Sequence, residues 1–134
     1  MIKFPDIEAL LIAWLSGQLA ALSVDADVAK LIPAGRSQAS PARPLVQLRV
    51  SGGRKDMASM AAPLITIDTW ASDSETASGL AETVRGLIPE LRLYAGVQFY
   101  LHNEAGGPVD FPDTPTGQSR YRQIHTIRYR GRAA

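Results

Sequence analysis

The sequence predicts an α+β protein in which a mixed sheet of four to five strands carries two amphipathic helices on one face, in the order α-β-β-α-β-β. Two stretches repeat apolar residues at helical spacing, and others alternate apolar with polar residues as strands do. One strand pattern also leads directly into the second helix. With 134 residues, 46% of them hydrophobic and 20% charged, the chain is expected to form a single domain over 1–134.

Composition narrows the possible functions. The net charge of +1 and the pI of about 8.1 do not by themselves favour nucleic acid. The sequence has no cysteine, which excludes disulfides and thiolate sites. The apolar stretch 7–22 is shorter than a membrane span, and Asp6 and Glu8 do not suit a signal peptide. We therefore expect no membrane association and no targeting role for this stretch.

The first helix is expected over 7–22, with Asp6 as its N-cap. It should lie on the same sheet face as the second helix, with the Trp14 ring in the core. Its apolar stripe comprises Ile7, Leu10, Leu11, Trp14, Leu15, Leu19 and Leu22.

Two strands and two connections follow. A short, weak strand at 28–32 leads into a loop at 33–44 that is rich in proline and arginine, and 45–50 alternates as a half-buried strand. The segment 51–62 is expected to be a charged loop that exposes Met57 and Met60. Two interpretations of this loop stay open: a solvated hairpin tip or a partner-binding loop.

The segment 64–88 is expected to form a strand, a capped turn and a helix. The strand over 64–71 is rich in β-branched residues. Ser72 and Glu75 fit a capping box, and Pro89 should end the helix. The apolar positions of this helix are Ala77, Leu80, Ala81, Val84, Leu87 and Ile88.

The C-terminal third should contain two strands. A strand over 93–102, joined to the preceding strand by the helix, predicts a parallel crossover. Val97, Phe99 and Leu101 would share one face of this strand, with Gln98, Tyr100 and His102 on the opposite face. A turn at 105–108 and an irregular segment over 109–119 should precede the last strand, 120–130. That strand divides into a face with Tyr121, Gln123, His125, Ile127 and Tyr129 and a face with Arg120, Arg122, Ile124, Thr126, Arg128 and Arg130.

No catalytic motif is recognisable, so neither enzyme activity nor a cofactor or metal is expected. The run 52–55 resembles a phosphate loop superficially, but it lacks the hydroxyl residue and the following helix. His102, Glu104, Asp110 and Asp113 could form a hard-metal or acid–base site, although solvated polar residues beside a turn are far more common. His125 is expected to be a hydrogen-bonded sheet histidine rather than a ligand.

The arginine-bearing side of the last strand allows three interpretations, with Tyr94, Tyr100, Tyr121 and Tyr129 as possible neighbours. The arginines can contact nucleic-acid phosphates, bind carboxylates of a partner protein, or protect an edge strand by charge.

Several segments together resemble the tail terminator, or tail-completion, proteins of long-tailed bacteriophages. The resemblance covers most of the chain and is carried by the helix start at 6–10, the segments 45–53 and 63–71, and the run from Phe111-Pro112-Asp113 to Gly117-Gln118-Ser119-Arg120-Tyr121-Arg122-Gln123. It implies a non-enzymatic virion protein at the head-proximal end of the tail, present in the host cytoplasm during assembly.

The resemblance further implies a homo-oligomeric ring, usually six-fold, whose subunits can stay monomeric until assembly. Such a ring caps the tail-tube protein, ends tail growth and joins the head–tail connector, while DNA passes through the lumen without sequence-specific binding. The alternative is a small nucleic-acid-binding module that uses the arginine-rich last strand. Candidate subunit or partner contacts are Arg36, Arg43, Arg54, Lys55, Met57, Met60, Arg120, Arg122, Arg128 and Arg130.

Overall fold

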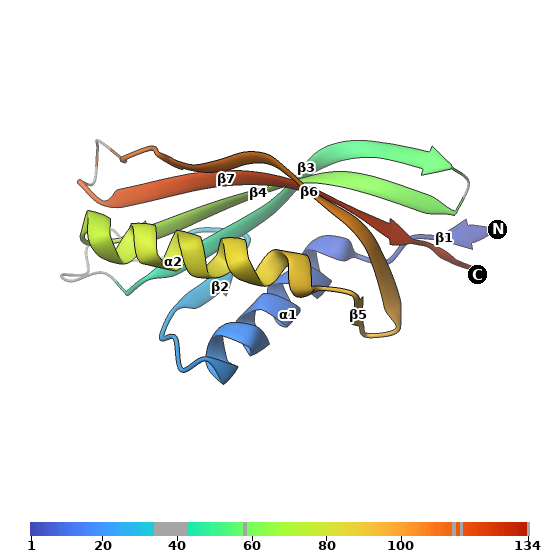
Figure 1. Ribbon diagram of the computed structural model, residues 1–134, viewed down its shortest axis with the longest axis horizontal. Helices are drawn as coiled ribbons and strands as arrows, with labels where there is room; N and C mark the ends of the chain where they lie inside the picture. Colours follow the sequence, from blue (N-terminus) through green and yellow to red (C-terminus); the bar gives the residue numbers. More distant parts are fainter. Residues whose placement is uncertain (34–42, 58, 114, 116, 134) are drawn as a thin grey trace.

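The computed structural model describes residues 1–33, 43–57, 59–113, 115 and 117–133, with only the backbone at 53–57, 132 and 133 (Figure 1). Two α-helices and a short 3-10 helix accompany a six-stranded mixed sheet and a two-stranded sheet. The elements in order are β1 (Ile2–Lys3), α1 (Ile7–Ala21), β2 (Asp27–Ala29), β3 (Leu45–Met57), β4 (Met60–Ala71), α2 (Ser74–Leu87), η2 (Ile88–Glu90), β5 (Leu93–Tyr94), β6 (Val97–Asp110), β7 (Ser119–Arg130) and β8 (Arg132–Ala133).

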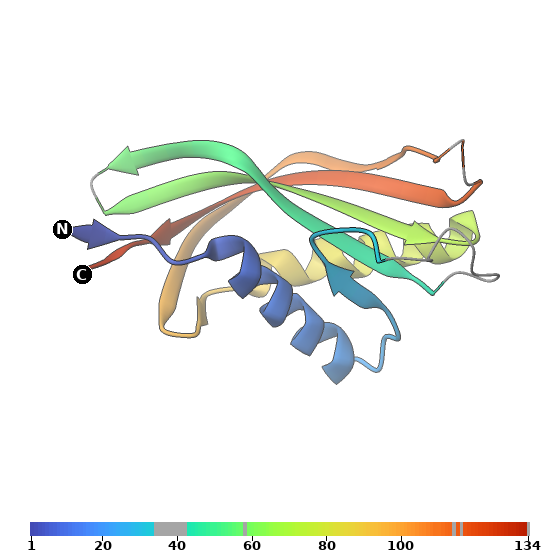
Figure 2. The same cartoon turned by 180° about the vertical axis from the view of Figure 1, so that it is seen from behind.

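The α+β class and the two helices on one face of a mixed sheet are as predicted, but the strand number and order differ. The large sheet runs β2-β3-β4-β7-β6-β5, and β1 pairs separately with β8. Because β4 and β6 are both antiparallel to β7, they are parallel to each other, with β7 between them. Figures 1 and 2 show α1 and α2 on the same side of the sheet, and both helices contribute to one hydrophobic core.

Helix α1 begins as predicted. The Asp6 carboxylate accepts a hydrogen bond from the backbone N–H of Ala9 at 3.1 Å. The helix ends before Ser23, whose φ of 57° leaves the helical region. Leu22 was expected in the buried stripe, but it follows the last helical turn and is 55% exposed. The buried positions are Ile7, Leu11, Trp14, Leu15 and Leu19.

The prediction of a loop at 51–62 is wrong, because the two neighbouring strands continue into it. β3 and β4 form one long hairpin whose pairing extends to Met57 and Met60, with register shifts near Gly52, where φ is 95°. A glycine tolerates this φ, so the strand passes the irregularity and resumes pairing. The hairpin tip lies at the same end of the molecule as both termini (Figures 1 and 2). Met60, expected to be exposed, is 8% exposed.

Helix α2 is capped one residue later than predicted. Asp73, rather than Ser72, accepts hydrogen bonds from the Thr76 backbone N–H at 2.8 Å and from the Thr76 hydroxyl at 2.9 Å. These bonds lower the pKa of Asp73, because they favour its ionised form. A carboxylate at the N-cap also suits the positive end of the helix dipole. The predicted apolar stripe of α2 and η2 is buried throughout.

The region after α2 differs most from the prediction. The expected strand 93–102 is broken by Ala95 and Gly96, whose φ values of 50° and 74° make a two-residue turn between β5 and β6. β6 then continues through the predicted turn at 105–108 and into the predicted irregular segment, ending at Asp110. Its pairing with β7 is interrupted by three register shifts, so the glycines bend the strand instead of ending it.

The sheet has two long edges that are only partly paired. β2 covers β3 only from Leu45 to Gln47, and β5 covers β6 only at Val97 and Gln98. On the β3 edge, the Glu8 carboxylate accepts a hydrogen bond from the Val50 N–H at 2.9 Å and also pairs with Lys30 at 2.9 Å. Separately, among the described residues no helix has the length and apolar character needed to cross a membrane.

Candidate functional site: the arginine face

The sheet surface opposite the helices carries most of the exposed positive charge of β7. The register places Arg122 beside Asp68 and Arg120 beside Trp70, with Arg128 beside Tyr100 further along. We call this surface the arginine face. Its charged residues include Arg49, Asp68, Arg120, Arg122, Arg128 and Arg130.

Asp68 is the centre of one ionic cluster on this face. Its side chain is 1% exposed, and it accepts two hydrogen bonds from Arg122, at 2.8 Å to Nε and 3.0 Å to Nη2. Arg49 Nη2 donates to the same carboxylate at 3.3 Å. The bond to Asp68 raises the pKa of Arg122. Two guanidiniums therefore share one carboxylate, and the cluster keeps a net positive charge.

Arg120 is held by aromatic rings rather than by a carboxylate. Its guanidinium carbon lies 4.6 Å from the Trp70 ring centroid and 4.5 Å from that of Phe111. Arg120 Nε donates to the Phe111 carbonyl oxygen at 2.8 Å. Arg122 also lies 4.5 Å from the Phe111 centroid. Cation–π contacts help to fix both guanidiniums on the surface. Arg122 is also paired with Asp68, whereas Arg120 is held by the rings and the carbonyl oxygen.

The other end of β7 carries the second arginine pair. Arg130 is exposed, and its guanidinium carbon lies 5.7 Å from the Tyr100 ring centroid. Arg128 is half-buried on the same face. Of the four tyrosines expected near the arginines, Tyr100 is placed there. Tyr121 and Tyr129 alternate to the helix side, and Tyr94 packs against the core.

The helix side of β7 carries a buried chain of neutral polar groups. Gln123 Nε2 donates to the Ala81 carbonyl oxygen of α2 at 3.0 Å. Gln123 Oε1 is 2.7 Å from His125 Nε2, and His125 Nδ1 is 2.8 Å from His102 Nε2. Because Gln123 Oε1 can only accept, His125 Nε2 must donate and a neutral His125 must accept from His102. The prediction of a hydrogen-bonded sheet histidine is thus confirmed.

Burial determines the protonation of the two histidines in this hydrogen-bonded series. His125 is fully buried, which lowers its pKa to about 4, and the neighbouring His102 and Arg85 act in the same direction while Glu104 opposes them. Burial also lowers the pKa of His102, against the charge of Glu104. Glu104 itself is held by Arg85 through bonds of 2.6 and 2.9 Å. The hydrogen-bonded side chains Gln123, His125 and His102 are therefore neutral at pH 7, and their role is to satisfy polar groups in the core.

His102 reaches His125 through a shift that the sequence pattern did not predict. The register between β6 and β7 slips between Tyr100 and His102, and Leu101 adopts a φ of 30°. The slip turns Leu101 outward, where it is 72% exposed, and brings His102 to the helix side. The predicted faces are therefore reversed for these two residues. Asp110 pairs with Tyr121 at the other end of β7, so the possible site with His102 and Glu104 does not form, and no metal-binding cluster occurs among the described residues.

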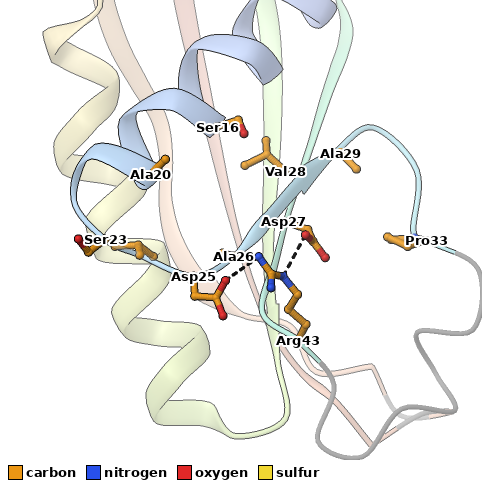
Figure 3. Close-up of a pocket in the computed structure, with 11 residues that line it drawn as sticks. Ser16, Ala20, Ser23, Asp25, Ala26, Asp27, Val28, Ala29, Pro33 and Arg43 are labelled. Atoms are coloured by element: carbon orange, nitrogen blue, oxygen red, sulfur yellow. Dashed lines mark ion pairs between the residues drawn. The ribbon is translucent and has the colours of Figure 1, made fainter.

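A hollow of about 820 Å³ lies between the end of α1, β2 and the start of β3 (Figure 3). Arg43 bridges two acidic residues there, with Nη2 2.6 Å from Asp25 and Nε 3.0 Å from Asp27. All three side chains are substantially exposed, so these ion pairs are worth little in stability. The described lining offers small residues and one ion-pair cluster, which gives no basis for assigning a ligand.

The remaining candidate contacts are placed as follows. Arg36 lies outside the described residues. Arg54, Lys55 and Met57 lie in β3, where only the backbone is described, so the run 52–55 is a bulged strand and not a phosphate loop. Met60 is buried and Arg43 is engaged within the chain. The four arginines of β7 lie together on the arginine face, joined by Arg49, which the sequence reasoning did not include. The sequence did indicate where Arg49 lies, because it shares the polar side of the 45–50 strand with Gln47.

Comparison with known proteins does not assign a family. No protein-family model matches the chain, and no curated protein matches it.

Proposed function

We propose that this protein is a tail terminator of a long-tailed bacteriophage. Six copies would form a ring that caps the tail tube, ends its growth and presents a joining surface to the head connector. DNA would pass through the lumen, and the protein would act as a virion component without enzyme activity. The support is the resemblance of the helix start, the 45–53 and 63–71 segments and the 111–123 run to that family.

The observation that carries the ring is the pair of partly open sheet edges. A ring of identical subunits needs two different surfaces that meet head to tail. One edge is β3 beyond Val50, whose N–H is bound by Glu8, and the other is β6 beyond Phe99, whose N–H is bound by the Arg92 carbonyl oxygen. They lie on opposite sides of the same sheet, so contact between the β6 edge of one copy and the β3 edge of the next repeats from subunit to subunit.

The β6 edge also exposes apolar side chains. Leu101 is 72% exposed and Val109 is 60% exposed, and Phe111 directly after the strand is 44% exposed. Burying such side chains stabilises an interface by about 25 cal/mol per Å² of apolar surface, before the costs of association. On the opposite edge, the β3 segment with Arg54, Lys55 and Met57 supplies the candidate contacts that we propose for the neighbouring subunit.

The test uses the elongation of tail tubes. Purified tail-tube protein of a long-tailed phage is allowed to polymerise, and tube lengths are measured by negative-stain electron microscopy with and without this protein. We expect short tubes of uniform length in its presence. A double variant with Leu101→Asp and Val109→Asp should lose this effect.

The matched control is Leu22→Asp, because Leu22 is also exposed but lies at the end of α1. It should cap tubes as the wild type does. Unchanged tube lengths with the wild-type protein would contradict the proposed function, and capping by the double variant would contradict the proposed edge contact.

A further inference from the structure

We propose that the arginine face binds the phosphate backbone of duplex DNA without regard to sequence. This goes beyond the proposed ring function, because it is a property of the single chain and does not require assembly. Three properties of the face support phosphate binding: the number of its charges, the way they are held, and the other side chains that it exposes.

The charge on this face is strongly one-sided. Five arginines share it with the buried carboxylate of Asp68 and with Asp113 at its end, although the whole chain has a net charge of only +1. Asp68 is already occupied by Arg122 and Arg49. In addition, Arg49 Nε is buried and makes no hydrogen bond. The face therefore attracts anions, although the overall composition gives no sign of it.

The arginines are also arranged in advance. Arg120 and Arg122 lie against the Phe111 ring, and Arg130 lies over Tyr100. Guanidiniums fixed in this way lose less conformational freedom when they bind phosphate. From Arg120 to Arg130, a strand spans about 34 Å, which is close to one helical turn of B-DNA. Both ends of the row can thus reach phosphates on one side of a duplex.

The same contacts favour a duplex over a single strand. Single-strand binders stack bases on exposed aromatic faces. Here the guanidiniums of Arg120 and Arg122 lie over Phe111, and that of Arg130 lies over Tyr100, so these rings hold arginines instead of bases. The backbone is then the part of the nucleic acid that the face can contact, and such contacts carry no sequence information.

The surroundings favour DNA over an acidic protein. Protein interfaces usually contain an apolar, aromatic-rich core, whereas DNA interfaces are polar and strongly positive. Between the two arginine pairs, the outward residues of β7 are Ile124 and Thr126, both half-buried. Of the exposed apolar residues of β6, Val109 pairs in register with Arg122, and Leu101 follows the register partner of Arg128. They therefore lie at the two ends of the row, and its centre carries no exposed apolar side chain among the described residues.

The test measures fluorescence anisotropy of a labelled 20-base-pair duplex, and of a second duplex with scrambled sequence, between 25 and 200 mM salt. Both duplexes should bind equally, and log K should fall against log salt with a slope of about −2.7 to −4.5, for about three to five phosphate contacts. Arg130→Gln should make the slope less steep by about 0.9. Arg92→Gln, which removes one charge from an exposed position after η2, should leave it unchanged.

A second variant tests whether the fixed positions of the arginines, and not only their charges, contribute to DNA binding. Phe111→Ala removes the ring beneath Arg120 and Arg122 but no charge, so it should weaken binding about two- to fivefold at fixed salt with little change of slope. Equal slopes for Arg130→Gln and Arg92→Gln, tighter binding of the single strand, or equal competition by polyglutamate would each overturn the proposal. The anisotropy uses no tube protein, so a negative result here leaves the tube-capping result intact, and the reverse also holds.

Discussion

The two faces of β7 solve the burial of polar groups in different ways. On the helix side, Gln123 and His125 are buried beneath α2 and form a neutral hydrogen-bonded chain. On the arginine face, Asp68 is equally buried but is paired with Arg122 and Arg49, whose side chains reach solvent. Successive residues of β7 thus belong in turn to a neutral hydrogen-bonded network covered by α2 and to an ionic network that reaches solvent.

The difference indicates which side is available for binding. A neutral amide and imidazole can be covered by a helix, because hydrogen bonds satisfy their polar groups. A charged cluster is expensive to cover unless its charges are balanced, and here positive charge exceeds negative. The helices therefore cover the side that can be sealed, and the side with unbalanced charge stays open.

The largest expected effect is on the helix side. Trp14→Ala removes a ring that is 6% exposed and packs in the core, so it should lower the free energy of unfolding by about 3–5 kcal/mol. Phe111→Ala on the arginine face, where the ring is 44% exposed, should cost less than about 1 kcal/mol. Urea unfolding of both variants measures this. Similar losses would mean that the two faces do not differ in their contribution to the core.

The buried, neutral His125 predicts that the stability of the protein depends on pH. The pKa of His125 is about 4 when folded, against 6.5 for the free side chain, so the unfolded state binds more protons between these values. Stability should therefore fall as pH drops from about 6.5 to about 4, by about 3 kcal/mol in total. His102, whose pKa is also lowered, acts in the same direction.

The measurement is the urea midpoint at several pH values, compared with a His125→Gln variant. The variant should show a shallower dependence between pH 6.5 and 5, above the range in which carboxylates protonate. An unchanged slope would show that His125 is not the titrating group. The charged groups around it, Glu104 and Arg85, are paired with each other and keep their charges in this range.

The ionic cluster predicts a smaller loss that can be rescued. Asp68→Asn leaves Arg122 and Arg49 without their carboxylate and should cost about 2 kcal/mol, less than for a fully buried pair because both arginines are partly exposed. Asp68→Leu combined with Arg122→Met should recover most of that loss. Thermal unfolding tests both variants, and no recovery in the double variant would argue against an ionic cause.

The smallest effect concerns the β3 edge. Glu8→Ala removes the acceptor of the Val50 N–H and the partner of Lys30, and should cost about 1 kcal/mol. It should also speed hydrogen exchange at Val50. Burial alone would raise the pKa of Glu8, but the Val50 N–H and Lys30 outweigh it and lower the pKa. The exchange effect should hence be larger at pH 7 than at pH 3, and protection equal to wild type would show that the edge is closed by other means.

The sequence predicted those features that depend on local periodicity. The two helices, the buried Trp14 and the two faces of β7 follow from spacing alone. Asp73 replaced Ser72 as the cap because either side chain suits that position. The sheet class and the shared helix face were likewise predictable, since an apolar stripe must meet an apolar sheet face.

The features that the sequence did not predict depend on pairing between strands that are distant in sequence. The hairpin continues through Gly52, and β6 continues through its glycines, because neighbouring strands supply hydrogen bonds that local turn signals do not reveal. One register slip at Leu101 exchanged the faces of two residues and created the contact between His102 and His125. The arginine face was visible as alternation, but its centre, Asp68, appeared only when the register was known.

The mass of the assembled protein tests the central proposal most directly. Multi-angle light scattering should be recorded at rising concentration, for the protein alone and with added tail-tube protein of a long-tailed phage. A subunit of 14.4 kDa predicts a ring of about 86 kDa for six copies, in solution or on the tube. A mass that stays at one subunit under both conditions would contradict the account.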